Sequence, residues 1–307
     1  VVEILAKNGD LLAERLGVRL VLRGVADLDV KTDRGVAIDP ALLTTDGAAL
    51  VARPDVDVVV ELIGGTGAAK AFILQALKLG KPVVTANKKL LAEYGEEIHR
   101  TAEAHNTEIL FEASVGGGIP IIKALREGLC ANRIQSLYGI LNGTCNYILT
   151  RMEDEQLPFD EVLKAAQAAG YAEAEPSLDV DGHDTAHKAA VLASLAYGCN
   201  VPLAKVRVAG IRGIAQADIA YAAEMGYRIK LLAIIRGEAD GVEASVQPTL
   251  VKHSHQLAAV SGVFNAVLVK GDVVGTTLYY GRGAGRAATA SAVVADLADA
   301  ALNLRAG

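Results

Sequence analysis

The stretch DVVVELIGG, residues 57–65, decides the fold class of this chain. Its apolar run is short and rich in valine, which is typical of a strand buried in a parallel sheet. Two glycines end the run, and residues 68–79 then follow a helical pattern. Strand and helix patterns alternate in this way through residue 130, so we expect a parallel sheet with right-handed crossovers.

Further strands and helices are predicted on both sides of this stretch. Up to residue 130 we expect strands at 18–25, 82–85 and 108–111, and a helix at 90–104. Beyond it we expect strands at 135–141, 228–236, 242–251 and 263–269, and helices at 144–154, 159–169, 184–197 and 287–304. The change of pattern near residue 131 predicts two domains, an α/β domain before it and an α+β domain after it.

Composition excludes several classes of protein. Of 307 residues, 51% are hydrophobic and 21% charged, so a disordered chain is excluded. The net charge of −6 leaves no basic surface for nucleic acid or an anionic membrane. No apolar run reaches the roughly 18 residues of a membrane span. The three cysteines have neither metal-ligand nor disulfide spacing, which fits a reducing cytosol.

The densest group of ionisable side chains is GYAEAEPSLDVDGHDTAHK, residues 170–188. Asp184 and Lys188 are four residues apart, so we expect them to pair on one face of a helix. A lysine held in this way can exchange a proton with a substrate oxygen. The charges by themselves, however, favour a solvated acidic loop that leads into a helix.

Two metal sites in this segment are disfavoured. His183 and His187 have the spacing of a zinc-protease helix, but an aspartate stands where that motif needs glutamate, and no third ligand follows. Asp179 and Asp181 resemble the start of a calcium loop, but its closing glutamate is replaced by Ala190.

Three other segments carry polar groups or glycines near predicted strand ends. Lys88 follows the strand at 82–85, where a cofactor and a substrate would meet, although for a lone lysine a surface position beside a helix cap at Asn87 is the more common explanation. Residues 112–119 offer an acid and exposed carbonyls that could bind a monovalent cation, although the sequence alone favours a glycine-rich turn. GRGAG at 281–285 fits a phosphate-binding turn or a simple turn.

Taken together, these stretches resemble homoserine dehydrogenase over nearly the whole chain. The family signature is similar to the segment from Ala166 to Lys188, and its long spacing of Gly, Pro, three Asp and the final Lys makes it specific. Other blocks that resemble the family are ELIGG (61–65), VTANKKLLA (84–92), EASVGGGIPII (112–122), GILNGTCNYIL (139–149), GVFNAVLVKGDVVG (262–275) and TASAVVADL (289–297).

The resemblance implies an NAD(P)-dependent oxidoreductase that interconverts L-homoserine and L-aspartate 4-semialdehyde, a reaction of threonine, methionine and isoleucine biosynthesis. It implies a Rossmann-like parallel-sheet domain that binds the dinucleotide, over 1–130 and 285–307, and an α+β substrate-binding and dimerisation domain over 131–284. It also implies a cytoplasmic homodimer that acts on a small molecule. Two alternatives stay open. One is another semialdehyde or amino-acid dehydrogenase of related architecture, and the other is a non-catalytic dimerisation or ligand-sensing module.

The resemblance also assigns residues to roles. Lys188 matches the proton donor and acceptor, and Lys88 matches a residue that contacts both cofactor and substrate. The implied substrate contacts are Glu173, Asp179, Asp184, Gly143 and Thr144. The implied cofactor contacts are Ile63, Gly64, Lys88, Gly170, Glu173 and Gly285. A Na⁺ or K⁺ site is implied at the Glu112 side chain and the carbonyls of Val115, Gly117 and Ile119.

Several features depart from the family pattern. The chain begins at Val1 inside a predicted helix, so we expect the first strand and glycine-rich turn of the fold to be missing from it. No C-terminal regulatory domain is expected either. Ala26 stands where an arginine is common, and Asp27 follows. This favours NAD over NADP, because an acid there can bond a ribose diol. Glu175 and Ala288 are milder departures.

Overall fold

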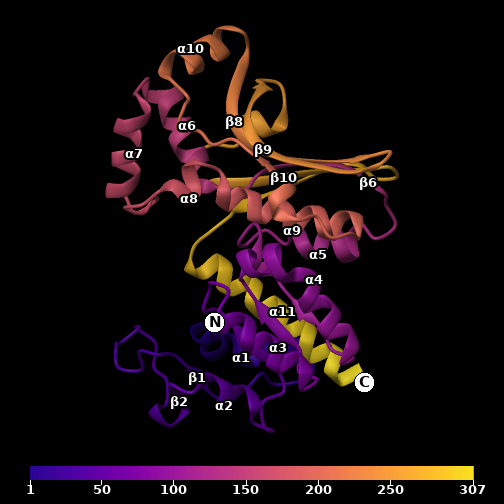
Figure 1. Cartoon of the computed structure of the whole chain (residues 1–307). Helices are drawn as coiled ribbons and strands as arrows, with labels where there is room; N and C mark the ends of the chain where they lie inside the picture. Colours follow the sequence, from indigo (N-terminus) through magenta and orange to yellow (C-terminus); the bar gives the residue numbers. More distant parts are fainter. Residues whose placement is uncertain (307) are drawn as a thin grey trace. The chain divides into compact units, whose positions relative to one another are not determined.

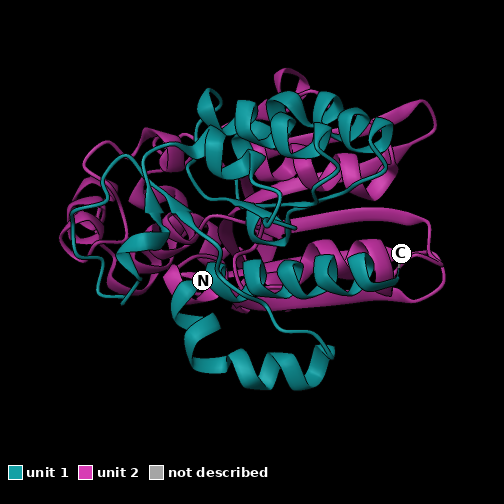
Figure 2. Cartoon of the chain, turned by 90° about the horizontal axis from the view of Figure 1, so that it is seen from below, with its two compact units in different colours: residues 1–114, 289–307 teal, residues 115–288 magenta. Residues whose placement is uncertain are grey.

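A computed structural model describes residues 1–306, which form two compact units (Figure 2). Unit 1 comprises residues 1–114 and the described residues from Thr289 onward, and unit 2 comprises residues 115–288. The expected α/β class, with a parallel-strand domain and a second sheet domain, is confirmed. The domain boundaries expected from the sequence, at 130/131 and 284/285, divide the chain by the ligand that each part binds. They stay a prediction, because the two compact units are defined by packing alone.

Unit 1 is built from helices and short parallel strands. Its helices are α1 (Val2–Leu16), α2 (Gly47–Ala52), α3 (Ala68–Lys78), α4 (Lys88–Ala104) and most of α11 (Arg286–Ala306). Its strands are β1 (Val25–Ala26), β2 (Leu43–Thr44), β3 (Val59–Glu61), β4 (Val83–Thr85) and β5 (Ile109–Leu110). The ladders β1–β2 and β3–β4–β5 are both parallel, so the carboxyl ends of β3 and β4 lie at the same edge.

The strand predicted at 18–25 is wrong over most of its length. Only Val25 and the next residue, Ala26, form a ladder, in register with Leu43 and Thr44 of β2. A strand needs a neighbour to hydrogen-bond with, and β2 lies beside only these two residues. The apolar residues before them are still used, since Leu20 packs against the core of unit 1.

Helix α11 belongs to the core of unit 1. It is the one helix among residues 1–306 that is long and apolar enough to cross a membrane by length and composition. Asp296 and Asp299 interrupt its apolar residues, which is why the sequence shows no continuous run of that length. Its buried side chains form a cluster with those of β4, β5 and the residues after β5: Val84, Leu110, Ala113, Ala292, Val293, Leu297 and Ala300. The buried apolar residues of α11 thus contribute to the core of unit 1.

Unit 2 is built around one large sheet (Figure 1). Its strands are β6 (Ile134–Ile140), β7 (Arg207–Val208), β8 (Tyr227–Glu238), β9 (Gly241–Lys252), β10 (Phe264–Gly271) and β11 (Gly275–Arg282), in the order β11-β10-β6-β8-β9-β7. Its helices are α5 (Ile121–Lys123), α6 (Gly143–Glu155), α7 (Phe159–Ala168), α8 (Ser177–Val180), α9 (His183–Tyr197) and α10 (Gln216–Glu224). The pairs from β11 to β9 are antiparallel, and β7 joins β9 in parallel.

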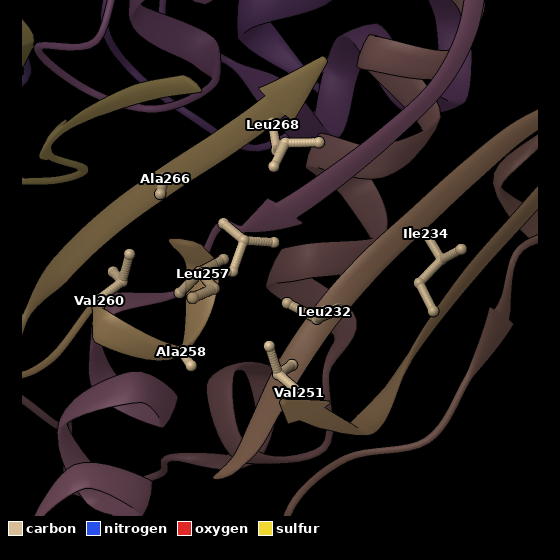
Figure 3. Close-up of a cluster of buried hydrophobic side chains, with 9 residues drawn as sticks. Leu232, Ile234, Val251, Leu257, Ala258, Val260, Ala266 and Leu268 are labelled. Atoms are coloured by element: carbon tan, nitrogen blue, oxygen red, sulfur yellow. The ribbon is translucent and has the colours of Figure 1, made fainter. Parts of the chain in front are cut away.

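The central strand β8 of the unit 2 sheet is covered on both faces, which explains its apolar run at residues 231–235. Residues 229–235 of β8 are all buried. Helix α9 contacts β8 and β9 (Figure 1). A separate cluster joins side chains of β6, β8, β9 and β10 to the short 3₁₀ helix at Gln256–Ala259 (Figure 3). The helices α6 and α9, which carry the candidate site, are thus seated on a rigid sheet.

Candidate active site

The predicted ion pair between Lys188 and Asp184 is present on helix α9. The Lys188 Nζ atom lies 2.6 Å from Asp184 Oδ2 and donates a second hydrogen bond, 2.7 Å long, to the carbonyl oxygen of Leu141 at the end of β6. Both side chains are buried, with 11% of the lysine and 7% of the aspartate side chain exposed. A buried ion pair is held tightly, because separation would leave an uncompensated charge.

Asn142 connects this ion pair to Asp179. Its Nδ2 atom donates to Asp179 Oδ1 at 2.7 Å and to Asp184 Oδ2 at 3.0 Å. Its Oδ1 atom accepts from the backbone nitrogen of Cys145 at 2.8 Å and so caps helix α6. Burial raises the pKa of the Cys145 thiol well above its usual value, and the nearby aspartates act in the same direction. Cys145 is therefore a neutral thiol beside two carboxylates.

The loop at residues 209–213 holds helix α8, which carries Asp179. The backbone nitrogen of Ile211 donates to the carbonyl oxygen of Val180 at 2.7 Å. The Arg212 guanidinium binds both carboxylate oxygens of Asp181, at 2.9 and 3.0 Å, and keeps the pKa of Asp181 below its usual value. Backbone and side-chain contacts thus fix α8 from the same loop.

Gly210 makes the closest approach in this loop and provides a test of it. A Cβ atom at Gly210 would lie 2.2 Å from the carbonyl oxygen of Val180 and 2.4 Å from Asp181 Cα, which are backbone atoms that cannot turn away. We expect Gly210→Ala to lower the free energy of unfolding by about 1–3 kcal/mol, measured by urea denaturation. Gly213→Ala is the matched control, since nothing lies within 4 Å of a Cβ there. Equal stability of the two variants would contradict the close packing.

The other predicted substrate residues lie at the start of α6 and in the loop after α7. Gly143 packs so closely that a Cβ would lie 2.8 Å from the Val263 carbonyl oxygen. Thr144 Oγ1 donates to the Tyr171 carbonyl oxygen at 2.6 Å, which ties α6 to the loop that contains Glu173. Glu173 is exposed, so its carboxylate faces solvent.

Two glycine-rich loops of unit 2 pack against each other. A Cβ at Gly117 would lie 2.5 Å from the carbonyl carbon and oxygen of Gly283, and Gly118 donates a backbone hydrogen bond to Arg282 at 3.1 Å. Val115 and Ile119, at either end of the first loop, are buried. Glycine at position 117 is therefore needed for this backbone contact.

In unit 1, a buried network joins the carboxyl ends of β3 and β4. Glu61 Oε2 accepts from Thr85 Oγ1 at 2.7 Å, and Thr85 Oγ1 accepts from the backbone nitrogen of Asn87 at 3.0 Å. Asn87 in turn caps helix α4, as predicted, and donates from Nδ2 to the Gly65 carbonyl oxygen at 2.8 Å. The two strand ends are thus fixed relative to each other.

The predicted cofactor residues of unit 1 border this network. Glu61 Oε1 accepts from the backbone nitrogens of Ile63 at 2.7 Å and Gly64 at 3.1 Å. Ile63 is exposed, although its side chain is large and apolar. Lys88 is the first residue of α4 and is half-buried. A nucleotide would therefore meet an ordered backbone, an apolar side chain and a lysine at this sheet edge.

Two further predicted residues of unit 1 have defined partners. Glu112 is buried, and its backbone nitrogen donates to Asp296 Oδ2 of α11 at 2.8 Å. Asp27, the residue that favours NAD, is about half exposed, and its carboxylate lies 2.9 Å from the guanidinium of Arg34. An arginine beside this acid offsets its charge, and the sequence alone gives no sign of that pairing.

The structure thus brings Lys188, Asp184 and Asp179 together in unit 2. Lys88, Ile63 and Gly64 lie in unit 1. Sequence reasoning missed Asn142, which hydrogen-bonds Asp179 and Asp184, and Glu61, which hydrogen-bonds Ile63, Gly64 and Thr85. Asn142 directly follows the strand predicted at 135–141, and the signal that could have found it is its helix-cap position directly before Gly143 and Thr144. Glu61 could have been found as an acid inside an apolar strand.

Comparisons with known proteins identify the family. The family model of homoserine dehydrogenase matches residues 120–298, and that of the homoserine dehydrogenase NAD-binding domain matches residues 1–112. The chain is 51% identical to a homoserine dehydrogenase of Neisseria gonorrhoeae over 298 residues, which cover 97% of this chain and 68% of that protein.

Solved structures give the same result. A homoserine dehydrogenase from Thiobacillus denitrificans superposes with a TM-score of 0.96 at 48% identity, over 99% of this chain and 70% of that one. A hyperthermophilic archaeal homoserine dehydrogenase in complex with NADPH superposes with a TM-score of 0.73 at 30% identity, over 84% of this chain and 75% of that one. The chain spans about two thirds to three quarters of the length of these relatives. The chain belongs to the homoserine dehydrogenase family of oxidoreductases.

Proposed function

We propose that this protein interconverts L-homoserine and L-aspartate 4-semialdehyde with an NAD(P) cofactor, and that Lys188 moves the proton. The observation that carries this proposal is the buried Lys188–Asp184 ion pair with Asp179 beside it. An ammonium has three N–H donors, and Lys188 directs two of them at Asp184 and the Leu141 carbonyl. We assign the third direction to the substrate oxygen.

The substrate's own charges account for the other acids. Homoserine carries an ammonium group, which Glu173, Asp179 and Asp184 are suited to bind. To oxidise the alcohol, Lys188 must act as the neutral amine, which takes the hydroxyl proton and becomes the ammonium. In the reverse direction the ammonium gives a proton to the aldehyde oxygen and becomes the neutral amine. A positioned group of this kind contributes roughly 10²–10⁴ to the rate. The nicotinamide, when bound, accepts the hydride from the alcohol carbon.

The proposed cofactor residues fit a nicotinamide dinucleotide. Gly64 has φ +81° and Gly170 has φ +74°, and nothing lies within 4 Å of a Cβ at either position. Gly285 has φ +117° and is equally open. Open glycine backbone allows a ligand to approach the main chain closely. Lys88 and Glu173 would add charged contacts, and the choice between NAD and NADP would depend on Asp27 and its partner Arg34.

We also propose a Na⁺ or K⁺ ion at the Glu112 carboxylate and the carbonyls of Val115, Gly117 and Ile119. Among residues 1–306, no three His, Cys, Asp or Glu side chains gather to hold a metal. A site with one carboxylate and several backbone carbonyls carries little charge, which suits a monovalent cation better than a divalent one.

A cytoplasmic homodimer completes the proposal. Strand β11 is an edge strand of the unit 2 sheet, and the turn before it exposes Val273 and Val274. Leu278 and Tyr280 of β11 are also exposed, so a second copy would cover apolar surface there. All three cysteines are free, which suits a reducing compartment.

The test is homoserine-dependent reduction of NAD⁺ and NADP⁺, followed by the absorbance of the reduced nicotinamide. We expect turnover with L-homoserine and much slower turnover with L-malate, which lacks the ammonium group that the acids would bind. Comparison of kcat/KM for the two nucleotides tests the prediction from Asp27 that NAD is preferred. Absence of turnover with homoserine and either nucleotide would refute the proposed function.

A further inference from the structure

Asn142 has contacts that a helix cap does not need. It is buried between β6 and α6, and all three of its side-chain hydrogen bonds are made inside the protein. The bond from Cys145 to Oδ1 is the cap. The bonds from Nδ2 to Asp179 and Asp184 are made in addition, and they join side chains that α8 and α9 contribute.

The position of this amide between two carboxylates has an electrostatic consequence. Asp179 and Asp184 share one neutral donor group, and hydrogen bonds to a carboxylate stabilise its charged form. Asp184 Oδ2 accepts from both Asn142 and Lys188. Leu141, the residue before Asn142, accepts from the same lysine. Two consecutive residues therefore hold both partners of the ion pair.

We propose that Asn142 is a positioning residue whose amide keeps Asp179 and Asp184 ionised and in place and, through Asp184, orients the Lys188 ammonium. The role of Lys188 rests on the proposed function. The contacts of Asn142 with the two acids do not.

Aspartate at position 142 separates this role from capping. Aspartate has the shape of asparagine and caps helices equally well, but it has no N–H donor and adds a third carboxylate. The charged and titratable groups around it are Asp179 from α8, Asp184 and Lys188 from α9, and the neutral thiol of Cys145 from α6. Serine at this position keeps a capping oxygen, loses the donor and adds no charge.

We therefore expect Asn142→Asp to lower kcat/KM by about 100-fold and Asn142→Ser by about tenfold, as expected for the loss of hydrogen bonds to charged groups. In Asn142→Asp alone, the acidic limb of the pH profile of kcat/KM shifts to higher pH, because neighbouring carboxylates favour protonation. Asn132→Asp is the matched control, since Asn132 accepts hydrogen bonds from Val273 and Val274 through Oδ1, which aspartate retains. It should keep wild-type activity.

Stability provides a readout that does not depend on turnover. Asn142→Asp should be less stable than Asn142→Ser, and the difference in urea unfolding should grow as the pH rises and the third carboxylate ionises. The proposal would be overturned if Asn142→Asp had wild-type activity and the acidic limb of its pH profile were unshifted. Asn142 would then serve only as the cap of helix α6. An equal loss in both variants, with no pH-dependent difference in stability, would overturn it as well. If the wild type does not turn over homoserine, the proposed function is refuted. The pH dependence of stability in the two variants still tests whether the Asn142 amide keeps the two aspartates ionised.

Discussion

Lys188→Ala should lower kcat for homoserine oxidation by roughly 10²–10⁴, the contribution of a positioned proton donor and acceptor. Lys188→Arg should lose nearly as much. A guanidinium can still pair with Asp184, but it stays protonated at every working pH and cannot accept the hydroxyl proton. Steady-state kinetics of the two variants, with homoserine and NAD(P)⁺, measure this effect. The KM for the nucleotide should change little.

The two variants also separate catalysis from folding. Alanine removes the positive charge that pairs with the buried Asp184 carboxylate, so Lys188→Ala should also lose about 3–5 kcal/mol of unfolding free energy. Arginine retains the charge, so Lys188→Arg should be more stable than Lys188→Ala and yet equally inactive. Lys270→Ala on strand β10, an exposed position, is the control and should behave like the wild type. A kcat close to that of the wild type in Lys188→Arg would refute proton transfer by Lys188.

Lys230 should make the stability of the protein depend on pH. It lies on β8 with 2% of its surface exposed, and its Nζ atom donates to the Val260 carbonyl at 2.6 Å and to Asn146 Oδ1 at 3.1 Å. Burial lowers its pKa from 10.5 to about 8. Glu153 and Asp154 oppose this shift, and Arg228 adds to it.

The direction of the pH effect follows from proton binding. Between about pH 8 and 10.5 the unfolded chain keeps the Lys230 proton that the folded protein has released. The free energy of unfolding therefore rises with pH across this window, by about 3 kcal/mol in total. Lys230→Met has no proton to release, so this contribution should be absent from it.

Urea unfolding at a series of pH values measures this effect as the difference in unfolding free energy between the wild type and Lys230→Met. The contributions of the other titrating groups cancel in this difference. Lys252→Met is the control, because Lys252 is exposed on β9, opposite Tyr227 on the same hairpin as Lys230. Its difference from the wild type should not depend on pH. A constant difference for Lys230→Met across the window would contradict a lowered pKa at Lys230.

Elements with a strong periodic pattern were predicted closely. The run at 57–65 contains β3, and the helical pattern at 184–197 corresponds to α9, which ends at Tyr197. The strand at 18–25 was wrong over most of its length, because a ladder depends on a neighbour that local pattern does not reveal. Helix α10 and strand β7 were not predicted, since α10 is short and weakly amphipathic and β7 has two exposed residues at a sheet edge.

The candidate site divides in the same way. The Asp184–Lys188 pair could be predicted because four residues on a helix bring two side chains onto one face whatever surrounds them. The Asn87 cap of α4 is likewise a local feature. The contacts of the Asn142 amide with Asp179 and Asp184 could not be predicted, because these two residues lie on other helices.

The sequence alone therefore determines features that depend on residues close together in the chain. These are the main strands and helices, the helix cap at Asn87 and the ion pair of α9. Tertiary structure alone decides the contacts between residues far apart in the chain. Glu61 reaches Thr85, Asn142 reaches Asp179 and Asp184, and Gly210 lies against the backbone of α8. The physical reason is that burial removes water as the alternative partner of each polar group, so each must find its partner within the fold.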